Sequence, residues 1–289
     1  MNTKNNRAKG ITVVPAGGLA NRMRALASAL WLADTFSRPL TVVWHRNDEF
    51  NASFGDIFET KGLPFKLIEV SSVCERLKYH LFYETPRKKN LFFSKVTAYL
   101  TGSRHIFIRD AKSIAFFKES IKDFNGRIII SSGLQFADLD SEFITRIFKF
   151  TKEVESAKKR ILGNSMPSVA VQIRRTDNTK SIANSPTELF EEAIATTVEA
   201  CPSASIFLAT DDSATKTYLT SKFPRNIICN PNEAERDTLK GMIDAAAEFK
   251  IMTECDRIYG SYWSSFSEFA AIYGDNELIV VRSRPSDKD

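Results

Sequence analysis

The amino-acid sequence predicts an α/β protein made of two Rossmann-like domains with a cleft between them. Three observations favour this fold class. Strands and helices alternate at both ends of the chain, polar or glycine-rich segments follow several strands, and 289 residues exceed the length of a typical single domain. We place the boundary near residue 160, so the domains are expected to span residues 1–160 and 161–289.

The first half is expected to open with a β-α-β unit. Residues 11–15 are a short apolar run, a small-residue loop with Gly17 and Gly18 follows, and residues 21–36 carry apolar side chains at helical spacing. Residues 40–44 predict a second strand, so a parallel sheet is the expected arrangement. Further elements expected in this half are strands at 105–108 and 127–131 and a mostly helical stretch at 138–163.

The second half alternates between strands and helices more regularly. Its five expected strands read VAVQI, SIFLAT, NIIC, RIYGS and ELIVV, and they predict an open parallel sheet. Ser185, Pro186 and Glu188 have the pattern of a helix N-terminus, with Ser185 as the N-cap. Residues 174–184 are therefore expected to form a loop.

Composition excludes several classes of protein. The chain is 43% hydrophobic and 26% charged, as a globular protein is, and no run approaches the roughly 20 apolar residues that a membrane span needs. The four cysteines are scattered, which argues against a disulfide framework and against a zinc site. A cytoplasmic location is therefore expected.

The net charge of +5 favours anionic ligands. Acidic residues are interspersed among the basic ones, so nucleic acid is not the expected partner. Basic clusters at residues 87–89 and 158–160 are interpreted as solvated faces, and a peripheral contact with a membrane or glycolipid is the alternative.

The strand ends carry the candidate site, because ligands of open α/β sheets bind at the carboxyl ends of the strands. Arg174 and Arg175 directly follow VAVQI, with Asp177 nearby. The planar guanidinium suits bidentate recognition of phosphate and keeps its charge at physiological pH, so the pair predicts a diphosphate site. The alternative is an ion pair between one arginine and Asp177, with the other arginine facing solvent.

Two further strand ends in this half are polar. Asp211 and Asp212 follow SIFLAT, where one carboxylate can bind ligand hydroxyls or orient an arginine across the cleft, although Asp212 can instead cap the next helix. Ser264, Ser265 and Ser267 follow RIYGS, where hydroxyls and the free amides of a helix N-terminus together form an anion site. Capping alone is the alternative for these serines.

The glycine loop near the N-terminus is a fourth candidate position. Gly17 and Gly18 permit close approach of a ligand to the backbone, and Asn21 and Arg22 stand at the start of the following helix. The spacing matches neither GxGxxG nor a Walker loop, which disfavours NAD binding and ATP hydrolysis. Neither GxSxG nor HExxH occurs, and no metal site is expected.

Four motifs together carry a family resemblance. GGLANRMRALASAL, VQIRRTDNTK, FLATDD and GSYWSSFSEFAAIYG occur in an order that resembles the nodulation-type fucosyltransferases and their α1,6-, α1,2- and protein O-fucosyltransferase relatives. The resemblance leaves roughly residues 45–165 uncovered. It implies a GT-B-like fold and inverting, metal-independent transfer of a sugar, expected to be fucose from GDP-fucose. The donor would bind mainly the second domain as a co-substrate, without a cofactor, and a glycan or glycolipid acceptor mainly the first.

The resemblance also implies residue roles at the diphosphate. The arginine pair matches the pair that neutralises the leaving group, the two aspartates match the acidic pair of the TDD motif, and the three serines match the phosphate-binding turn. Arg174, Arg175 and Asp177 are thus the catalytic candidates, with Asp177 or an acid of the middle region as the general base. No residue of the sequence stands out as that base.

Base recognition rests on the same resemblance. Glu248 lies eight residues before Asp256, the spacing at which the α1,6 relatives carry an acid that recognises guanine, and Asp244 is a second candidate. Gln172 stands where those relatives often have a histidine near the base, and Asn178 where they often have a lysine. A transferase for another nucleotide sugar, or a binding module without turnover, stays an alternative.

Overall fold

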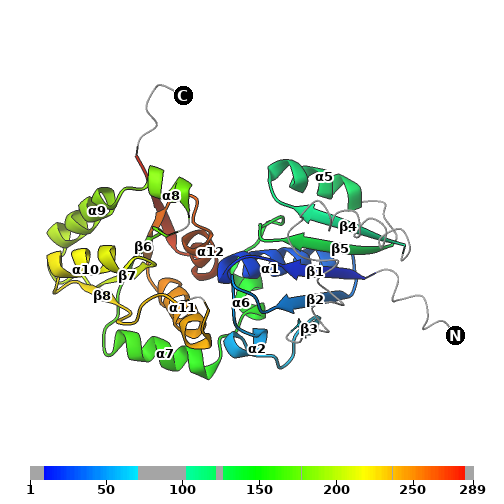
Figure 1. The fold of residues 1–289 in the computed structure, drawn as a ribbon, viewed down its shortest axis with the longest axis horizontal. Coiled ribbons are helices and arrows are strands. Elements are labelled where there is room, and N and C mark those ends of the chain that lie inside the picture. The colour runs from blue at the N-terminus through cyan, green and yellow to red at the C-terminus, as the bar shows by residue number, and fades with distance from the viewer. Residues whose placement is uncertain (1–9, 71–101, 122–125, 177, 236, 284–289) are drawn as a thin grey trace. The chain divides into compact units, whose positions relative to one another are not determined.

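The computed structural model describes residues 10–70, 102–121, 126–176, 178–235 and 237–283, and Figure 1 shows its fold. The chain divides into two compact units, one of Met1–Leu139 with Phe143–Lys149 and one of Asp140–Glu142 with Phe150–Asp289. Each unit is built on a five-stranded sheet in which all the strand pairs are parallel. The predicted α/β class with two parallel sheets is confirmed.

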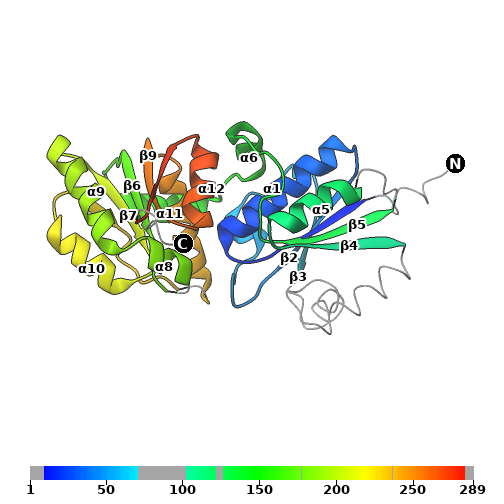
Figure 2. The same ribbon diagram turned by 90° about the horizontal axis from the view of Figure 1, so that it is seen from above.

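The sheet of the first unit has the strand order β3-β2-β1-β5-β4. Its strands are β1 (Ile11–Pro15), β2 (Leu40–His45), β3 (Lys66–Val70), β4 (Ser103–Ile108) and β5 (Arg127–Ser132), and its helices include α1 (Leu19–Thr35), α2 (Phe54–Ile57) and α5 (Ala111–Ile121). The connections β1-α1-β2 and β4-α5-β5 advance in the same direction across the sheet. Right-handed crossovers then put α1 and α5 on one face, as Figure 2 shows.

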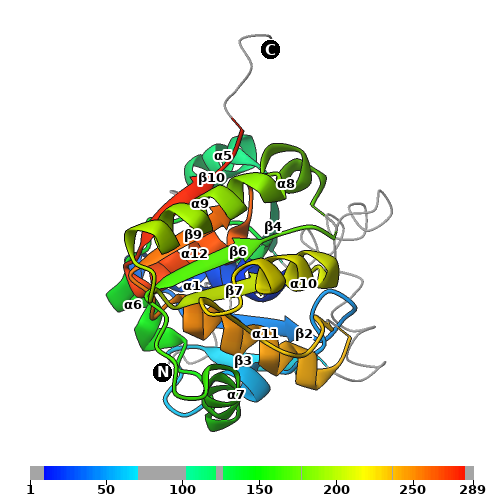
Figure 3. The ribbon, with the colours of Figure 1, turned by 90° about the vertical axis from the view of Figure 1, so that its left-hand side faces the viewer.

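The sheet of the second unit has the order β10-β9-β6-β7-β8. Its strands are β6 (Val169–Ile173), β7 (Ile206–Thr210), β8 (Ile227–Cys229), β9 (Arg257–Ser261) and β10 (Glu277–Val281). Helices α9 (Thr187–Ala200) and α10 (Ser213–Lys222) cover one face, where Val171 and Ile173 pack with Phe190 and Leu219. Helices α11 (Leu239–Met252) and α12 (Ser265–Gly274) follow crossovers that run the other way, so they cover the opposite face (Figure 3).

The predicted strands are confirmed, but β3 was not predicted, and the other differences lie in the helices. Helix α1 begins at Leu19, two residues before the predicted start, and the stretch 138–163 contains two helices, α6 (Ser141–Ile147) and α7 (Lys152–Leu162). Because α7 packs against α11, it belongs to the second unit. The division between the units therefore lies near residue 150 rather than near residue 160.

The loop predicted for residues 174–184 contains a short helix, α8 (Thr179–Asn184). Ser185 does not cap the next helix, since α9 has Pro186 at its N-cap position without a side-chain hydrogen bond. Instead, the Ser185 hydroxyl donates to the Val281 carbonyl and accepts from the Tyr262 backbone amide at 2.8 Å. A residue predicted to begin a helix thus ties the end of β10 to the turn after β9.

The described residues include only some of the basic and acidic residues that the sequence singled out. The basic cluster 87–89 lies outside them, as does Asp177. In the cluster 158–160, Lys158 pairs with Glu254 at 2.8 Å and Arg160 pairs with Asp244, so acids of the same unit face both side chains. Among the described helices, none combines the length and the apolar character that crossing a bilayer requires.

Candidate functional site

The segment after β6 is tied to both neighbouring strands. The backbone amide of Arg174 donates to the Ser261 hydroxyl at the end of β9 at 3.0 Å, and that hydroxyl donates to the Gln172 carbonyl at 3.1 Å. Ser261 is buried, so these bonds form away from water and hold their geometry firmly. The strand ends of β6 and β9 therefore fix the position at which the Arg174 side chain leaves the sheet.

Asp211, at the end of β7, organises the arginine pair from the other side. One carboxylate oxygen accepts the Arg175 backbone amide at 2.7 Å, and the other accepts the Thr176 hydroxyl at 2.7 Å. The second oxygen also lies 3.2 Å from Nε of Arg174. Asp211 thus orients an arginine of the adjacent strand in the same sheet, and the orientation of an arginine across the cleft stays a prediction.

The two arginines are used differently. The Arg175 guanidinium turns toward the start of α9, where Nε donates to the Thr187 hydroxyl at 3.1 Å and Nη2 donates to the Ser185 carbonyl. Nη1 donates to the Arg174 carbonyl at 3.2 Å. Burial lowers the pKa of Arg175, against the opposing effect of Glu188 and the two aspartates. Arg175 thus supports the loop, whereas the half-buried Arg174 points its charge along the carboxyl edge beside Asp211.

Asp212 occupies the N-cap position of α10. Its carboxylate accepts the Thr215 backbone amide at 2.7 Å, and hydrogen bonds from the side chain and then the backbone of Thr215 lower the pKa of Asp212. The sequence left two roles open for Asp212, ligand binding and helix capping, and in the structure Asp212 caps α10. A direct contact of Asp212 with a ligand stays a prediction.

The serine turn opens α12. Ser267 is buried and its hydroxyl donates to the Ser264 carbonyl at 3.2 Å, so it supports the turn instead of presenting a hydroxyl to a ligand, a correction to the sequence-based assignment. A Cβ on Gly260 would lie 2.4 Å from that same hydroxyl, which explains the glycine at this point of β9. Ser264 is also buried, and Ser265, at the first helical position, is half-buried. Ser265 and the first amides of α12 stay the predicted anion-binding groups of this turn.

The predicted guanine residues lie where β8 and α11 meet. Asn230, directly after β8, donates from Nδ2 to Oε1 of Glu248 at 3.0 Å, and the Lys216 ammonium holds the carbonyls of Asn230 and Asn232 at 3.0 and 2.7 Å. Burial raises the pKa of Glu248 to about 7, against the opposing effects of Asn230 and Lys216. Glu248 is therefore a carboxyl group whose charge changes near neutral pH.

Asp244, the second candidate for guanine, has partners within the protein. It pairs with Arg160 and accepts from Nδ2 of Asn232 at 2.6 Å. Gln172 differs, because it is only 4% exposed and its Oε1 has no hydrogen-bond partner among the described residues. It lies on the α11 and α12 face of the sheet, beside Gly260 and Ala209 on the adjacent strands. A buried amide oxygen without a partner is costly, so a ligand donor is its natural complement.

In the first unit, the glycine loop is held by Arg22, and this corrects the assignment of Arg22 to donor binding. Arg22 is 0% exposed, and its guanidinium donates to the Gly17 carbonyl at 2.7 Å, to the His45 carbonyl and to Oδ1 of Asn47 at 2.8 Å. Its charge also lies over the rings of Trp44 and Phe50. A residue enclosed in this way cannot reach a ligand.

The remaining residues of the loop stay candidates. Gly17 has a φ of +83°, and a Cβ there would lie 2.7 Å from Nδ2 of Asn21, so only glycine fits. Its amide donates to Oε2 of Glu49 at 3.0 Å. Oδ1 of Asn21 is buried without a hydrogen-bond partner, as Oε1 of Gln172 is. Gly17, Gly18 and Asn21 keep their predicted role.

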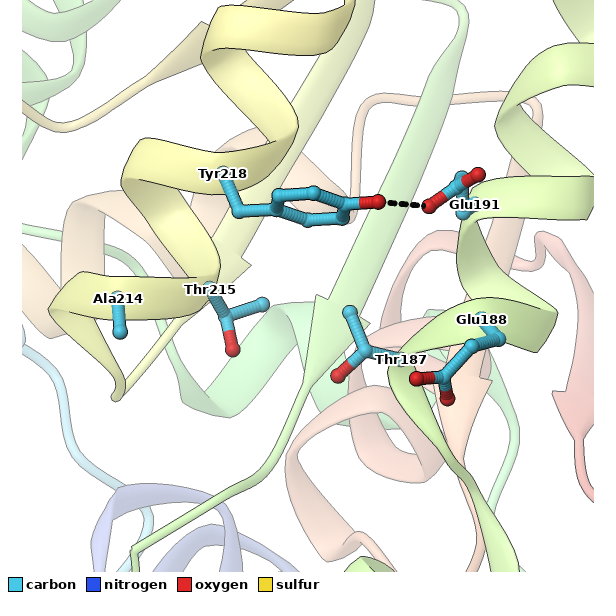
Figure 4. Close-up of a pocket in the computed structure, with 6 residues that line it drawn as sticks. All are labelled: Thr187, Glu188, Glu191, Ala214, Thr215 and Tyr218. Carbon is cyan, nitrogen blue, oxygen red and sulfur yellow. Dashed lines mark hydrogen bonds between the residues drawn. The ribbon is translucent and has the colours of Figure 1, made fainter.

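Figure 4 shows a pocket of about 280 Å³ between the starts of α9 and α10. The Tyr218 hydroxyl donates to Glu191 at 2.6 Å on its rim, and Glu188 adds a second carboxylate. None of the predicted donor-binding residues is among the described residues that line it. Its two carboxylates also make it unsuitable for a diphosphate. Separately, no group of His, Cys, Asp and Glu suited to holding a metal ion occurs among the described residues.

Comparisons with known proteins match the fold but not the sequence. Neither a protein-family model nor a curated protein sequence matches the chain. Among solved structures, fucosyltransferase NodZ from Bradyrhizobium gives a TM-score of 0.59 at 15% identity, over 91% of this chain and 92% of that one. A mutant of Arabidopsis thaliana FUT1 in complex with GDP gives a TM-score of 0.64 at 14% identity, over 97% of this chain and 71% of that one. POFUT1 in its apo form gives 0.57 at 15% identity over 97% and 99%.

These matches span nearly the whole of this chain and include both sheets. The chain has a GT-B-like fucosyltransferase fold. NodZ has also been solved with GDP and after soaking with GDP-fucose. In the second unit of this fold, candidate residues follow strands β9, β6 and β7 at the carboxyl edge of the sheet, and Glu248 lies on α11.

Sequence reasoning missed several residues of this edge. Thr176 and Ser261 fix the arginine loop, and Asn230, Asn232 and Lys216 surround the predicted base site. Asn230 and Asn232 follow NIIC directly, so the strand-end rule that found Arg174 would have found them too. Lys216 had no such signal, because it reaches the loop from within α10.

Proposed function

We propose that the protein is an inverting, metal-independent glycosyltransferase that transfers fucose from GDP-fucose to a glycan or glycolipid acceptor. The observation that carries the proposal is the Arg174 guanidinium at the carboxyl end of β6, oriented by Asp211 at the end of β7. The fold shared with NodZ, FUT1 and POFUT1 supports the reaction class, and NodZ has been solved with GDP and after soaking with GDP-fucose.

The proposed chemistry places charge stabilisation on the second unit. As the bond between the anomeric carbon and the diphosphate lengthens, negative charge grows on the leaving oxygens and the sugar becomes oxocarbenium-like. Arg174 and the first amides of α12 stabilise that growing charge more than they stabilise the bound donor, which lowers the barrier. The acceptor hydroxyl attacks the opposite face and its proton passes to a base, for which Asp177 and an acid of the middle region are the two candidates.

Nucleotide binding measured by calorimetry tests the proposal. We expect GDP to bind more tightly than UDP and TDP, because the unpartnered Gln172 oxygen and Glu248 are acceptors suited to the N–H groups of guanine. GDP release from GDP-fucose, with and without a panel of glycans and with EDTA present, then tests turnover. A preference for UDP would favour the other nucleotide-sugar transferase, and GDP binding without any turnover would favour a binding module.

Glu248 gives the affinity for GDP a predicted dependence on pH. Its pKa of about 7 means that the carboxyl is largely protonated below that value, whereas accepting two guanine N–H groups requires the carboxylate. Binding must then release a proton, so the affinity should fall by about tenfold for each pH unit below pH 7. Calorimetry with GDP between about pH 5.5 and 8 measures this slope.

Glu248→Gln is the matched control, because it keeps the size of the side chain and removes its titration. The variant should bind GDP more weakly at pH 8 and should lose most of the pH dependence. Any slope that remains in the variant reports the protonation of the GDP phosphate itself. An unchanged slope in Glu248→Gln would contradict the assignment of Glu248 to the base.

A further inference from the structure

Trp263 is a large apolar residue in an unusual place. It follows β9 directly, precedes the serine turn of α12 and is 59% exposed. Its φ is +60°, a left-handed conformation that non-glycine residues with bulky side chains rarely adopt. Such strain persists only where the surroundings impose it, and it is concentrated at ligand-binding sites.

The surroundings do impose this conformation. Nδ2 of Asn178 donates to the Trp263 carbonyl at 2.9 Å, and the preceding amide, of Tyr262, donates to the buried Ser185 hydroxyl at 2.8 Å. The ammonium of Lys180 lies 4.2 Å from the centre of the Trp263 ring, within the range of a cation–π contact. The indole is therefore held at the surface by helix α8 instead of packing into the core.

The order of the strands places Trp263 at one end of the candidate site. Along the carboxyl edge, the residues proposed for guanine follow β8 and lie on α11, and Arg174 follows β6. Trp263 follows β9, on the far side of β6 from the base residues. A nucleotide sugar lying along this edge, with its diphosphate at Arg174, would direct its sugar toward the β9 side.

We propose that Trp263 is a stacking platform for a pyranose ring at the transfer end of the site. This inference rests on the proposed function. The face of an indole ring is electron-rich and apolar, and the C–H groups of a pyranose pack against such a face while its hydroxyls remain free for hydrogen bonds. Lys180 supplies donors beside the ring for those hydroxyls. The ring stacked here belongs either to the transferred sugar or to the acceptor saccharide, and both would present a pyranose ring.

The decisive variant is Trp263→Gly. Glycine adopts a φ of +60° without strain, so the variant should unfold at the same temperature as the wild type or at a higher one. If the indole only supported the fold, the variant would unfold at a lower temperature than the wild type. Trp263→Phe keeps an aromatic face, and Trp31→Ala removes the other strongly exposed tryptophan, which is 39% exposed on α1.

Binding of GDP and GDP-fucose is measured by calorimetry, and binding of the GDP-loaded protein to a printed glycan array is measured in parallel. We expect Trp263→Gly to bind GDP as the wild type does and to lose about tenfold in affinity for a saccharide. The loss appears in GDP-fucose binding if the transferred sugar stacks, and on the array if the acceptor stacks. Trp263→Phe should recover most of the affinity, and Trp31→Ala should behave as the wild type.

Other results would overturn the inference. Equal losses for GDP and GDP-fucose in Trp263→Gly would make the indole part of the nucleotide site. Unchanged saccharide binding by Trp263→Gly in both assays would contradict the stacking role of Trp263. A wild type that binds GDP but no saccharide in either assay would contradict it too. The proposed function fails in a distinct way, when the wild type does not bind GDP at all.

Discussion

Arg174→Ala is expected to lower the turnover of GDP-fucose by about 10²- to 10³-fold, the loss typical of removing one preorganised donor to a developing charge. Arg174 is the arginine of the pair whose charge lies beside Asp211 at the carboxyl edge of the sheet. The fold should survive, because the backbone amide of Arg174 keeps its bond to Ser261. Steady-state release of GDP measures the effect, and the melting temperature confirms folding.

Arg175→Ala is the matched control, and its expected defect is different. Its guanidinium bonds the Ser185 carbonyl and the Thr187 hydroxyl, so the truncation should destabilise the protein by about 1–3 kcal/mol. Turnover of the molecules that stay folded should fall less than in Arg174→Ala. If Arg175→Ala lost more turnover than Arg174→Ala at equal stability, the diphosphate contact would belong to Arg175.

Most of the strands were predictable because strand signals are local, whereas their order within each sheet was not predicted. Strands such as ELIVV and VAVQI are apolar runs, and the turn residues between them punctuate the pattern. The unit boundary was not predictable, because α7 is an amphipathic helix whose buried face fits either neighbour. Its place in the second unit is decided by packing on α11, a tertiary contact that periodicity does not encode.

The candidate site was predicted at the level of residue types and less well at the level of roles. Arg174 and Asp211 were found because they follow strands, but their contact with each other within one sheet was not predicted. Ser267 and Arg22 were assigned to a ligand from their motifs, yet both are buried and bond their own backbone. A motif shows which residues a turn needs but does not separate those that touch a ligand from those that hold the turn.

Replacing Arg22 is expected to have the largest effect on stability. Arg22→Met should destabilise the protein by about 3–5 kcal/mol, because several buried acceptors lose their donor and each such loss costs about 1–3 kcal/mol. The change leaves the carbonyls of Gly17 and His45 and Oδ1 of Asn47 without the guanidinium that bonds them. Arg22→Lys should not restore the loss, because an ammonium cannot match three acceptors placed for a planar fork. Urea unfolding measures both variants.

Arg38→Ala serves as the control in the same unit. Arg38 bonds the Gly126 carbonyl at 3.2 Å from a half-buried position, so its truncation should cost about 1 kcal/mol. Because Arg22 joins the glycine loop to the end of β2, its loss should also weaken the binding of any ligand by the Gly17 loop. If Arg22→Met were as stable as the wild type but impaired in GDP-fucose turnover, Arg22 would not be a structural residue. It would instead contact a ligand after a rearrangement of this loop.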